Sequence, residues 1–214
     1  MGLFKSMFGG DDKSPPPRTL ASPKELTPGD MVKMEFAEQT LLSGKTLKVV
    51  EQNFYDVSAV ESCKAVSTMD GADKRLFLST STVNPDRPLE VAVALLPDDV
   101  FKIFKRKKFA AIFEEPENNN HRLTRKIDPS ALNELQGFVG ESYFQERTNE
   151  AYRSQKDCRN GSLIESAWSG FDYKLLVSDD RNHAVRIEVF DGGRTDVYLI
   201  AYLPLSKIAE YWPA

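Results

Sequence analysis

Apolar residues recur along the chain in short runs that are rich in β-branched and aromatic side chains, a composition typical of strands. Turn-forming residues at 70–71, 84–88 and 191–193 separate successive runs, and the Asp-Gly-Gly at 191–193 predicts a β-hairpin. Short connections of this kind favour antiparallel pairing. The expected strands are MVKMEF, KTLKVVEQNFYDVSAV, SCKAVSTM, RLFLSTS, LEVAVALL, FDYKLLVS, HAVRIEVF and TDVYLIAYL.

Other segments have a helical pattern. After Pro97, apolar residues share one helical face, acidic residues occupy the first turn and basic residues follow the end, which complements the helix dipole. LSKIAEYW, which follows Pro204, predicts a closing helix. Residues 116–160 are polar and predict a connecting region with a short helix from Asp128 to Leu135.

The two strand-rich blocks end alike. LEVAVALLPDDVFKIF and DVYLIAYLPLSKIAEYW each give a strand, Leu-Pro and an amphipathic segment, and the two prolines are 204 − 97 = 107 residues apart. Either the chain contains an internal duplication, or both blocks are ordinary meanders followed by a helix. The predicted fold class is α+β, with antiparallel sheets and capping helices, and with two pseudo-repeated halves if the duplication is real.

The expected domain organisation has four segments. Residues 1–28 form an apolar N-terminal peptide and a Pro-rich disordered linker, since the composition of the linker cannot bury enough apolar area to offset ordering. Residues 29–115 form the first α+β half, residues 116–160 the polar connecting region, and residues 161–214 the second half.

Composition narrows the functional classes. The net charge of −4 argues against a dedicated nucleic-acid binder, which normally has a basic surface. No apolar run approaches the ~18 residues that a membrane span needs. Lys5 and Ser6 interrupt the apolar start, so it does not resemble a secretory signal. We expect Cys63 and Cys158 to be reduced thiols rather than a disulfide, and the protein to be cytoplasmic, with peripheral contact to the inner membrane as a variant of that location.

The sequence contains no clear catalytic or metal-binding motif. His121 and His183 lack partners at metal-ligand spacing, and the carboxylate pairs at 114–115 and 179–180 lie where turns and helix ends are expected. No glycine-rich phosphate loop occurs, and Cys63 has no histidine nearby in sequence. The sequence therefore predicts no catalytic residue, cofactor or metal, although residues distant in sequence can still assemble a site.

A basic cluster is the first candidate site. We interpret it as an anion-binding surface for phosphate, nucleic acid or an anionic membrane. The alternative is a helix end that complements its own dipole, because neighbouring acidic residues offset much of the field. The cluster comprises Lys105, Arg106, Lys107, Lys108, Arg122, Arg125 and Lys126.

The apolar N-terminal peptide is the second candidate site. A helix this short is marginal in water and folds only against a membrane surface, a partner or the body of the protein. Gly2 and Ser6 also match the N-myristoylation pattern. Weak docking and a frayed terminus both remain open as interpretations. The side chains that share a face are Leu3, Phe4, Met7 and Phe8.

The start MGLFKSMFG, the Pro-rich tether, LTPGDMV and the closing IAEYWPA resemble the YjfK-like family of bacterial proteins. The resemblance implies no catalytic residues, because that family has no assigned activity. Its members are encoded beside a relative of the phage-shock membrane-stress protein, an ion-channel-like protein and a glutathionylspermidine-synthase-like protein. This setting implies an accessory role near the bacterial inner membrane.

The expected function is that of a non-enzymatic accessory or adaptor protein of a bacterial membrane-stress-type system. It binds a protein partner, and its N-terminal peptide docks weakly to a membrane or an assembly. One alternative is polyanion or nucleic-acid binding through residues 105–126, with an affinity that falls steeply as salt rises. The other alternative is an enzyme with a site between the two halves.

Overall fold

The computed structural model describes residues 18–58, 60–114, 121–127, 133–159 and 168–214. Strands predominate in these ranges, and both α-helices are short. The strands are β1 (Met31–Met34), β2 (Thr46–Val57), β3 (Glu61–Asp70), β4 (Leu76–Thr80), β5 (Leu89–Leu95), β6 (Arg122–Thr124), β7 (Ser142–Ser154), β8 (Ser169–Ser178), β9 (His183–Val189), β10 (Thr195–Leu203) and β11 (Ile208–Trp212). The helices are α1 (Pro97–Ile103) and α2 (Arg106–Ala110), with 3₁₀ turns at Pro23–Glu25, Ala111–Phe113, Asp191–Gly193 and Leu205–Lys207.

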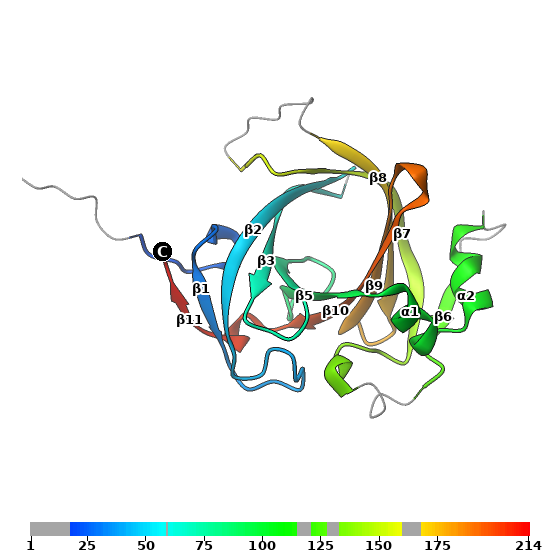
Figure 1. Cartoon of the computed structure of the whole chain (residues 1–214), viewed down its shortest axis with the longest axis horizontal. Helices are drawn as coiled ribbons and strands as arrows, with labels where there is room; N and C mark the ends of the chain where they lie inside the picture. The colour runs from blue at the N-terminus through cyan, green and yellow to red at the C-terminus, as the bar shows by residue number, and fades with distance from the viewer. Residues whose placement is uncertain (1–17, 59, 115–120, 128–132, 160–167) are drawn as a thin grey trace, which may run out of the picture.

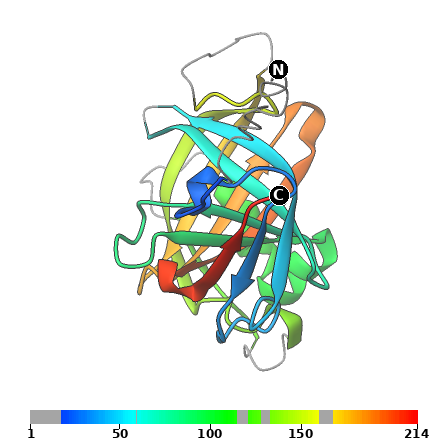
Figure 2. The same ribbon diagram turned by 90° about the vertical axis from the view of Figure 1, so that its left-hand side faces the viewer.

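The strands form one antiparallel sheet in the order β11-β1-β2-β3-β4-β5-β10-β9-β8-β7-β6. A further pairing between β2 and β7 closes the eight strands from β2 through β7 in this order into a barrel. Figure 1 shows these strands curving around a ring, with α1 and α2 outside it. Figure 2 shows β1 and β11 side by side against the outside of β2.

Side chains alternate between the barrel interior and its outer face, because successive residues of a strand point to opposite sides. Glu150 and Asp172 lie opposite each other in β7 and β8, and their exposure marks the outer face. The intervening positions point inward and form one buried cluster, rich in tyrosine. This interior cluster includes Tyr55, Val57, Val66, Ala92, Ala151, Phe171, Tyr173, Leu175, Val177, Ala184, Tyr198, Ile200 and Tyr202.

A larger apolar cluster covers the outer face of the barrel wall. Val91 of β5 and Leu199 of β10 belong to the wall, and they share this cluster with Val32 of β1 and Ile103 of α1. The helices and the outer strands thus bury the part of the wall that would otherwise expose apolar side chains to water.

The predicted α+β fold class with two repeated halves is wrong. The chain folds mostly as strands, and β5 from the first strand block pairs with β10 from the second along seven residues. Strands from both blocks therefore complete one barrel instead of two similar units.

The expected closing helix is a 3₁₀ turn followed by β11, because β1 supplies the residues 208–212 with backbone partners that helical periodicity does not reveal. Among the described residues, no helix is long and apolar enough to cross a membrane.

Several local predictions are confirmed. Each expected strand overlaps one of the strands β1–β5 or β8–β10, and α1 begins at Pro97 with acidic residues in its first turn. The hairpin at 191–193 joins β9 to β10, with Gly192 and Gly193 at φ values of 80° and 83° that glycine adopts without strain. The predicted connecting region, however, contains β7, which has 13 residues and is polar because it exposes much of one face outside the barrel.

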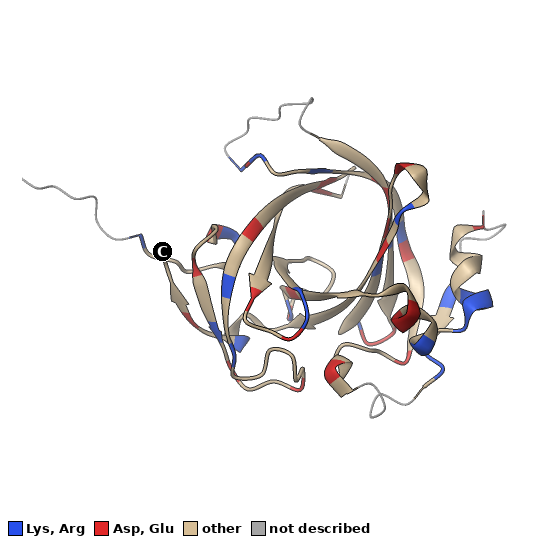
Figure 3. Ribbon diagram, viewed as in Figure 1, with Lys and Arg blue, Asp and Glu red and all other residues tan. Residues whose placement is uncertain are grey.

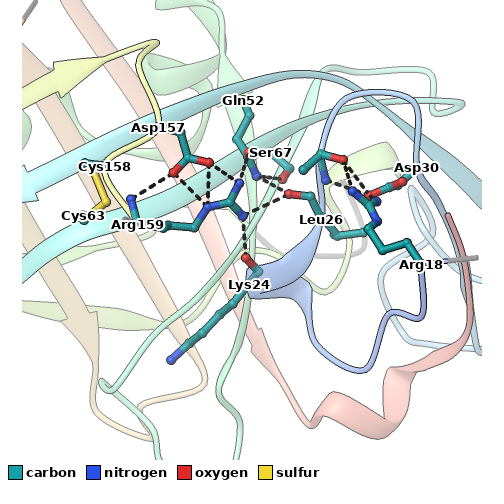
Figure 4. A network of polar contacts seen from close by, with 11 residues as sticks. Arg18, Lys24, Leu26, Asp30, Gln52, Cys63, Ser67, Asp157, Cys158 and Arg159 are labelled. Atoms are coloured by element: carbon teal, nitrogen blue, oxygen red, sulfur yellow. Dashed lines mark hydrogen bonds and ion pairs between the residues drawn. A yellow bond between two sulfur atoms is a disulfide. The ribbon is translucent and has the colours of Figure 1, made fainter. Parts of the chain in front are cut away.

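The prediction of reduced cysteines is also wrong. Cys63 of β3 and Cys158, just after β7, form a disulfide with Cα atoms 5.6 Å apart (Figure 4). The two cysteines are 95 residues apart in sequence, but β3 and β7 both pair with the second half of β2. The closure of the barrel therefore brings them together.

Candidate functional site in the barrel mouth

One end of the barrel opens into a hollow of about 640 Å³, which we call the barrel mouth. Its rim carries more positive than negative charge. The basic residues that line it are Arg75, Arg153, Lys156 and Arg194, and the acidic residues are Glu51 and Asp196. Aromatic rings of Tyr55, Phe77 and Tyr198 also line the hollow.

The arginines come from three different strands or strand ends. The guanidinium groups of Arg153 and Arg194 lie 5.0 and 3.9 Å from the ring centroid of Phe190, and this contact positions both beside the mouth. Arg194 is 3.6 Å from the carboxylate of Asp196. Within the described ranges, no acidic side chain lies within ion-pair distance of Arg75, Arg153 or Lys156. Asp196 therefore offsets part of the charge of Arg194, whereas Arg75, Arg153 and Lys156 have no ion-pair partner among the described residues.

Aromatic side chains give the mouth a partly apolar wall. The rings of Phe77 and Tyr198 pack edge to face with their centroids 5.3 Å apart. Burial raises the pKa of Tyr55 to about 12, so its phenol is neutral at physiological pH. The guanidinium of Arg186 lies 4.4 Å from the ring centroid of Tyr198 and 5.6 Å from that of Tyr55, inside the barrel.

A network of buried charges fills the interior next to the mouth. Arg186 Nη1 donates to Glu90 Oε1 over 3.2 Å, and Lys64 Nζ donates to Glu90 Oε2 over 2.8 Å. Arg186 Nε is 3.1 Å from Glu188 Oε1. Burial raises the pKa of Glu90, but Lys64 and Arg186 outweigh burial and hold the pKa of this carboxyl below its usual value. Lys64 Nζ also lies 3.3 Å from Glu61 Oε2, so two cations in this network face three anions.

The chemistry of this arrangement is recognition of an anion. An eight-stranded barrel is just wide enough for its own side chains or for one small ligand. Arginine side chains bind carboxylate, sulfonate or phosphate groups through paired hydrogen bonds, and flat rings accept a flat apolar body. Among the described residues, no group of His, Cys, Asp and Glu side chains is arranged to hold a metal ion.

The predicted basic cluster lies elsewhere. Figure 3 shows basic residues gathered at α2 and β6, outside the barrel ring. Arg122 forms a two-point ion pair with Asp179 at 3.0 and 3.1 Å, and Arg106 lies 4.3 Å from the ring centroid of Phe101. The structure thus gathers part of the cluster and neutralises some of its charge. Anion binding there stays a prediction, and the docking residues Leu3, Phe4, Met7 and Phe8 lie outside the described residues.

Sequence reasoning missed the mouth because its arginines are single residues scattered over the chain. The available signal was in HAVRIEVF, where Arg186 and Glu188 alternate with apolar residues inside an otherwise buried strand. Charges at such positions indicate a polar interior. Only strand order, however, places Arg75 beside Arg153 and Arg194.

His183 supports a prediction of pH dependence. Its Nε2 is 3.2 Å from the carbonyl oxygen of Gly137, and burial lowers the pKa of the imidazole, against the opposing effect of Asp180. The unfolded state therefore binds more protons between the folded pKa and the unfolded value of about 6.5. We expect the free energy of unfolding to fall as pH drops through this window, and to fall less in His183→Gln. Urea denaturation at about pH 7 and about pH 5.5 measures how strongly the free energy of unfolding depends on pH in the parent protein and in His183→Gln. An equal pH dependence in the two proteins would contradict the role given to His183.

Comparison of the chain with protein-family models, with curated proteins and with solved structures finds no match. The resemblance to the YjfK-like family therefore stays a prediction.

Proposed function

We propose that this protein is a non-enzymatic binding protein that takes a small organic anion into its barrel mouth. One observation carries the proposal: Arg75, Arg153 and Arg194 line a hollow of about 640 Å³ together with aromatic rings. Ligand pockets in proteins typically measure about 300–1,000 Å³, so the hollow suits a ligand of one or two rings. The proposal keeps the non-enzymatic part of the sequence-based expectation and changes the ligand.

The other parts of that expectation stay predictions. A protein partner and weak membrane docking depend on residues 3–8, which lie outside the described residues. The cytoplasmic location rested partly on reduced cysteines. Because disulfides persist mainly in oxidising compartments, the Cys63–Cys158 bond favours such a compartment instead.

Two fluorescent probes that share an aromatic frame test the proposal. 8-Anilinonaphthalene-1-sulfonate is an anion, and N-phenyl-1-naphthylamine lacks the sulfonate. We expect the anionic probe to bind one to one, and Arg153→Gln to weaken it about tenfold, the effect of losing a hydrogen bond to a charged group. The affinity for the neutral probe should change little in Arg153→Gln. Calorimetric and fluorescence titrations give the stoichiometry and the two affinities.

Arg87→Gln is the matched control, because Arg87 is a partly exposed arginine in the turn between β4 and β5 and belongs neither to the lining of the mouth nor to the predicted basic cluster. This variant should bind the anionic probe like the parent protein. The proposal fails if Arg153→Gln and Arg194→Gln both retain full affinity for the anionic probe, or if Arg87→Gln loses as much as they do.

A further inference from the structure

Glu188 occupies a position inside the barrel that adjoins the mouth. It lies directly opposite Asp196 of β10 in the strand register, and opposite Tyr173 of β8 on its other side. Asp196 lines the mouth. Residues directly opposite each other in a sheet point to the same face, so the Glu188 side chain lies in the interior next to the mouth. The side chain is fully buried.

The hydrogen-bonding capacity of Glu188 is only partly used. Arg186 Nε lies 3.1 Å from one carboxylate oxygen, and the Tyr55 hydroxyl interacts with the carboxylate and lowers its pKa. Neither oxygen, however, has a well-aligned hydrogen-bond donor among the described residues. Arg186 Nε and Nη2 also lack an acceptor among the described residues. Glu90, in the same network, accepts hydrogen bonds from both Lys64 and Arg186. The two buried carboxylates therefore differ, because Glu90 accepts two aligned hydrogen bonds and Glu188 accepts none.

A buried carboxylate whose oxygens lack aligned donors is costly even beside a cation, and buried oxygens in native proteins usually have a hydrogen-bond partner. The partner has to donate a hydrogen bond and reach the interior through the mouth. Glu188 lies beyond the residues that line the mouth, so a ligand held at the rim by its acidic group would have to extend its opposite end into the barrel to reach it.

We propose that Glu188 accepts a hydrogen bond from the inner end of the ligand. The ligand class is then a small aromatic or cyclic acid with an N–H or O–H group on the side of the ring opposite the acid. This inference rests on the proposed function, because it assumes that the acidic group sits at Arg153 and Arg194. The free Nη2 of Arg186 adds a donor, so a hydroxyl or amide group that both donates and accepts is accommodated as well.

A matched pair of probes tests the inference on the full chain. Naphthalene-1-sulfonate carries the acid alone, and 5-aminonaphthalene-1-sulfonate adds an N–H donor across the ring. We expect the amino compound to bind about tenfold more tightly, as for a hydrogen bond to a charged group. In Glu188→Gln the advantage should fall to about two- to threefold, because a neutral acceptor forms a weaker bond. Isothermal titration calorimetry measures all four affinities.

The comparison of two probes within one variant is insensitive to partial unfolding, since both probes meet the same folded fraction. Glu210→Gln, an exposed change on β11, is the control and should retain the tenfold preference. Equal binding of both probes by the parent protein overturns the role of Glu188 and leaves the proposed function standing. If Glu188→Gln keeps the tenfold preference for the amino compound, the role of Glu188 is likewise overturned and the proposed function still stands. Binding of neither probe overturns the proposed function itself.

Discussion

Loss of the Cys63–Cys158 disulfide should lower the free energy of unfolding by about 4–5 kcal/mol. The bond closes a loop across 95 residues. In the loop-entropy model a cross-link of about 100 residues removes enough freedom from the unfolded chain to stabilise the folded state by roughly 4.7 kcal/mol. This is a large part of the 5–15 kcal/mol that typical domains have.

Local contacts next to the disulfide add to this effect. Arg159 follows Cys158 directly, and its guanidinium donates to the carbonyl oxygen of Lys24 over 2.7 Å and of Leu26 over 3.3 Å (Figure 4). It also donates to Gln52 Oε1 of β2 over 3.3 Å. Without the disulfide, residues 23–26 should exchange their amide hydrogens faster than the barrel strands, because Arg159, which holds this segment through hydrogen bonds, is no longer fixed by the neighbouring Cys158.

Urea denaturation of the Cys63→Ser/Cys158→Ser variant, and of the parent protein with and without reductant, measures the stability change. Reductant should destabilise the parent protein and leave the double variant unaffected. A difference under about 1 kcal/mol between oxidised and reduced parent protein would show that the loop contributes little in the unfolded state.

Arg186→Met should lower the free energy of unfolding by about 3–5 kcal/mol, the usual cost of removing one partner of a buried ion pair. The Arg186 side chain is only 2% exposed and joins Glu90 to Glu188. Glu90 keeps Lys64 at 2.8 Å, so the unpaired charge left behind is that of Glu188. Burial already raises the pKa of Glu188, and removal of the neighbouring guanidinium raises it further.

The double variant Arg186→Met/Glu188→Gln separates charge from packing. It removes the stranded carboxylate, and we expect it to recover at least half of the lost stability. Urea denaturation of the two single variants, the double variant and the parent protein completes the cycle. If the double variant is no more stable than Arg186→Met, the loss comes from packing against Tyr55 and Tyr198, and the electrostatic explanation is wrong.

The sequence by itself determined the local elements of this protein. Runs of β-branched residues specify strands, Pro97 with Asp98 and Asp99 specifies the start of α1, and glycines at 192–193 specify a hairpin. Each of these depends on neighbours a few residues away, which the chain order displays directly. The polar strand β7 was not recognisable in this way, because its backbone is held by pairing with β2 and β8 rather than by an apolar face.

Only the tertiary structure decided how these elements combine. The pairing of β2 with β7 closes the barrel, joins Cys63 to Cys158 and turns alternate residues inward. It also collects single arginines from distant strands into one mouth and buries Glu188 beside them. The free energy of such long-range pairing depends on the whole set of strands together, so no local pattern encodes it. The strands are therefore readable from the sequence, whereas the barrel and the candidate site that it creates are not.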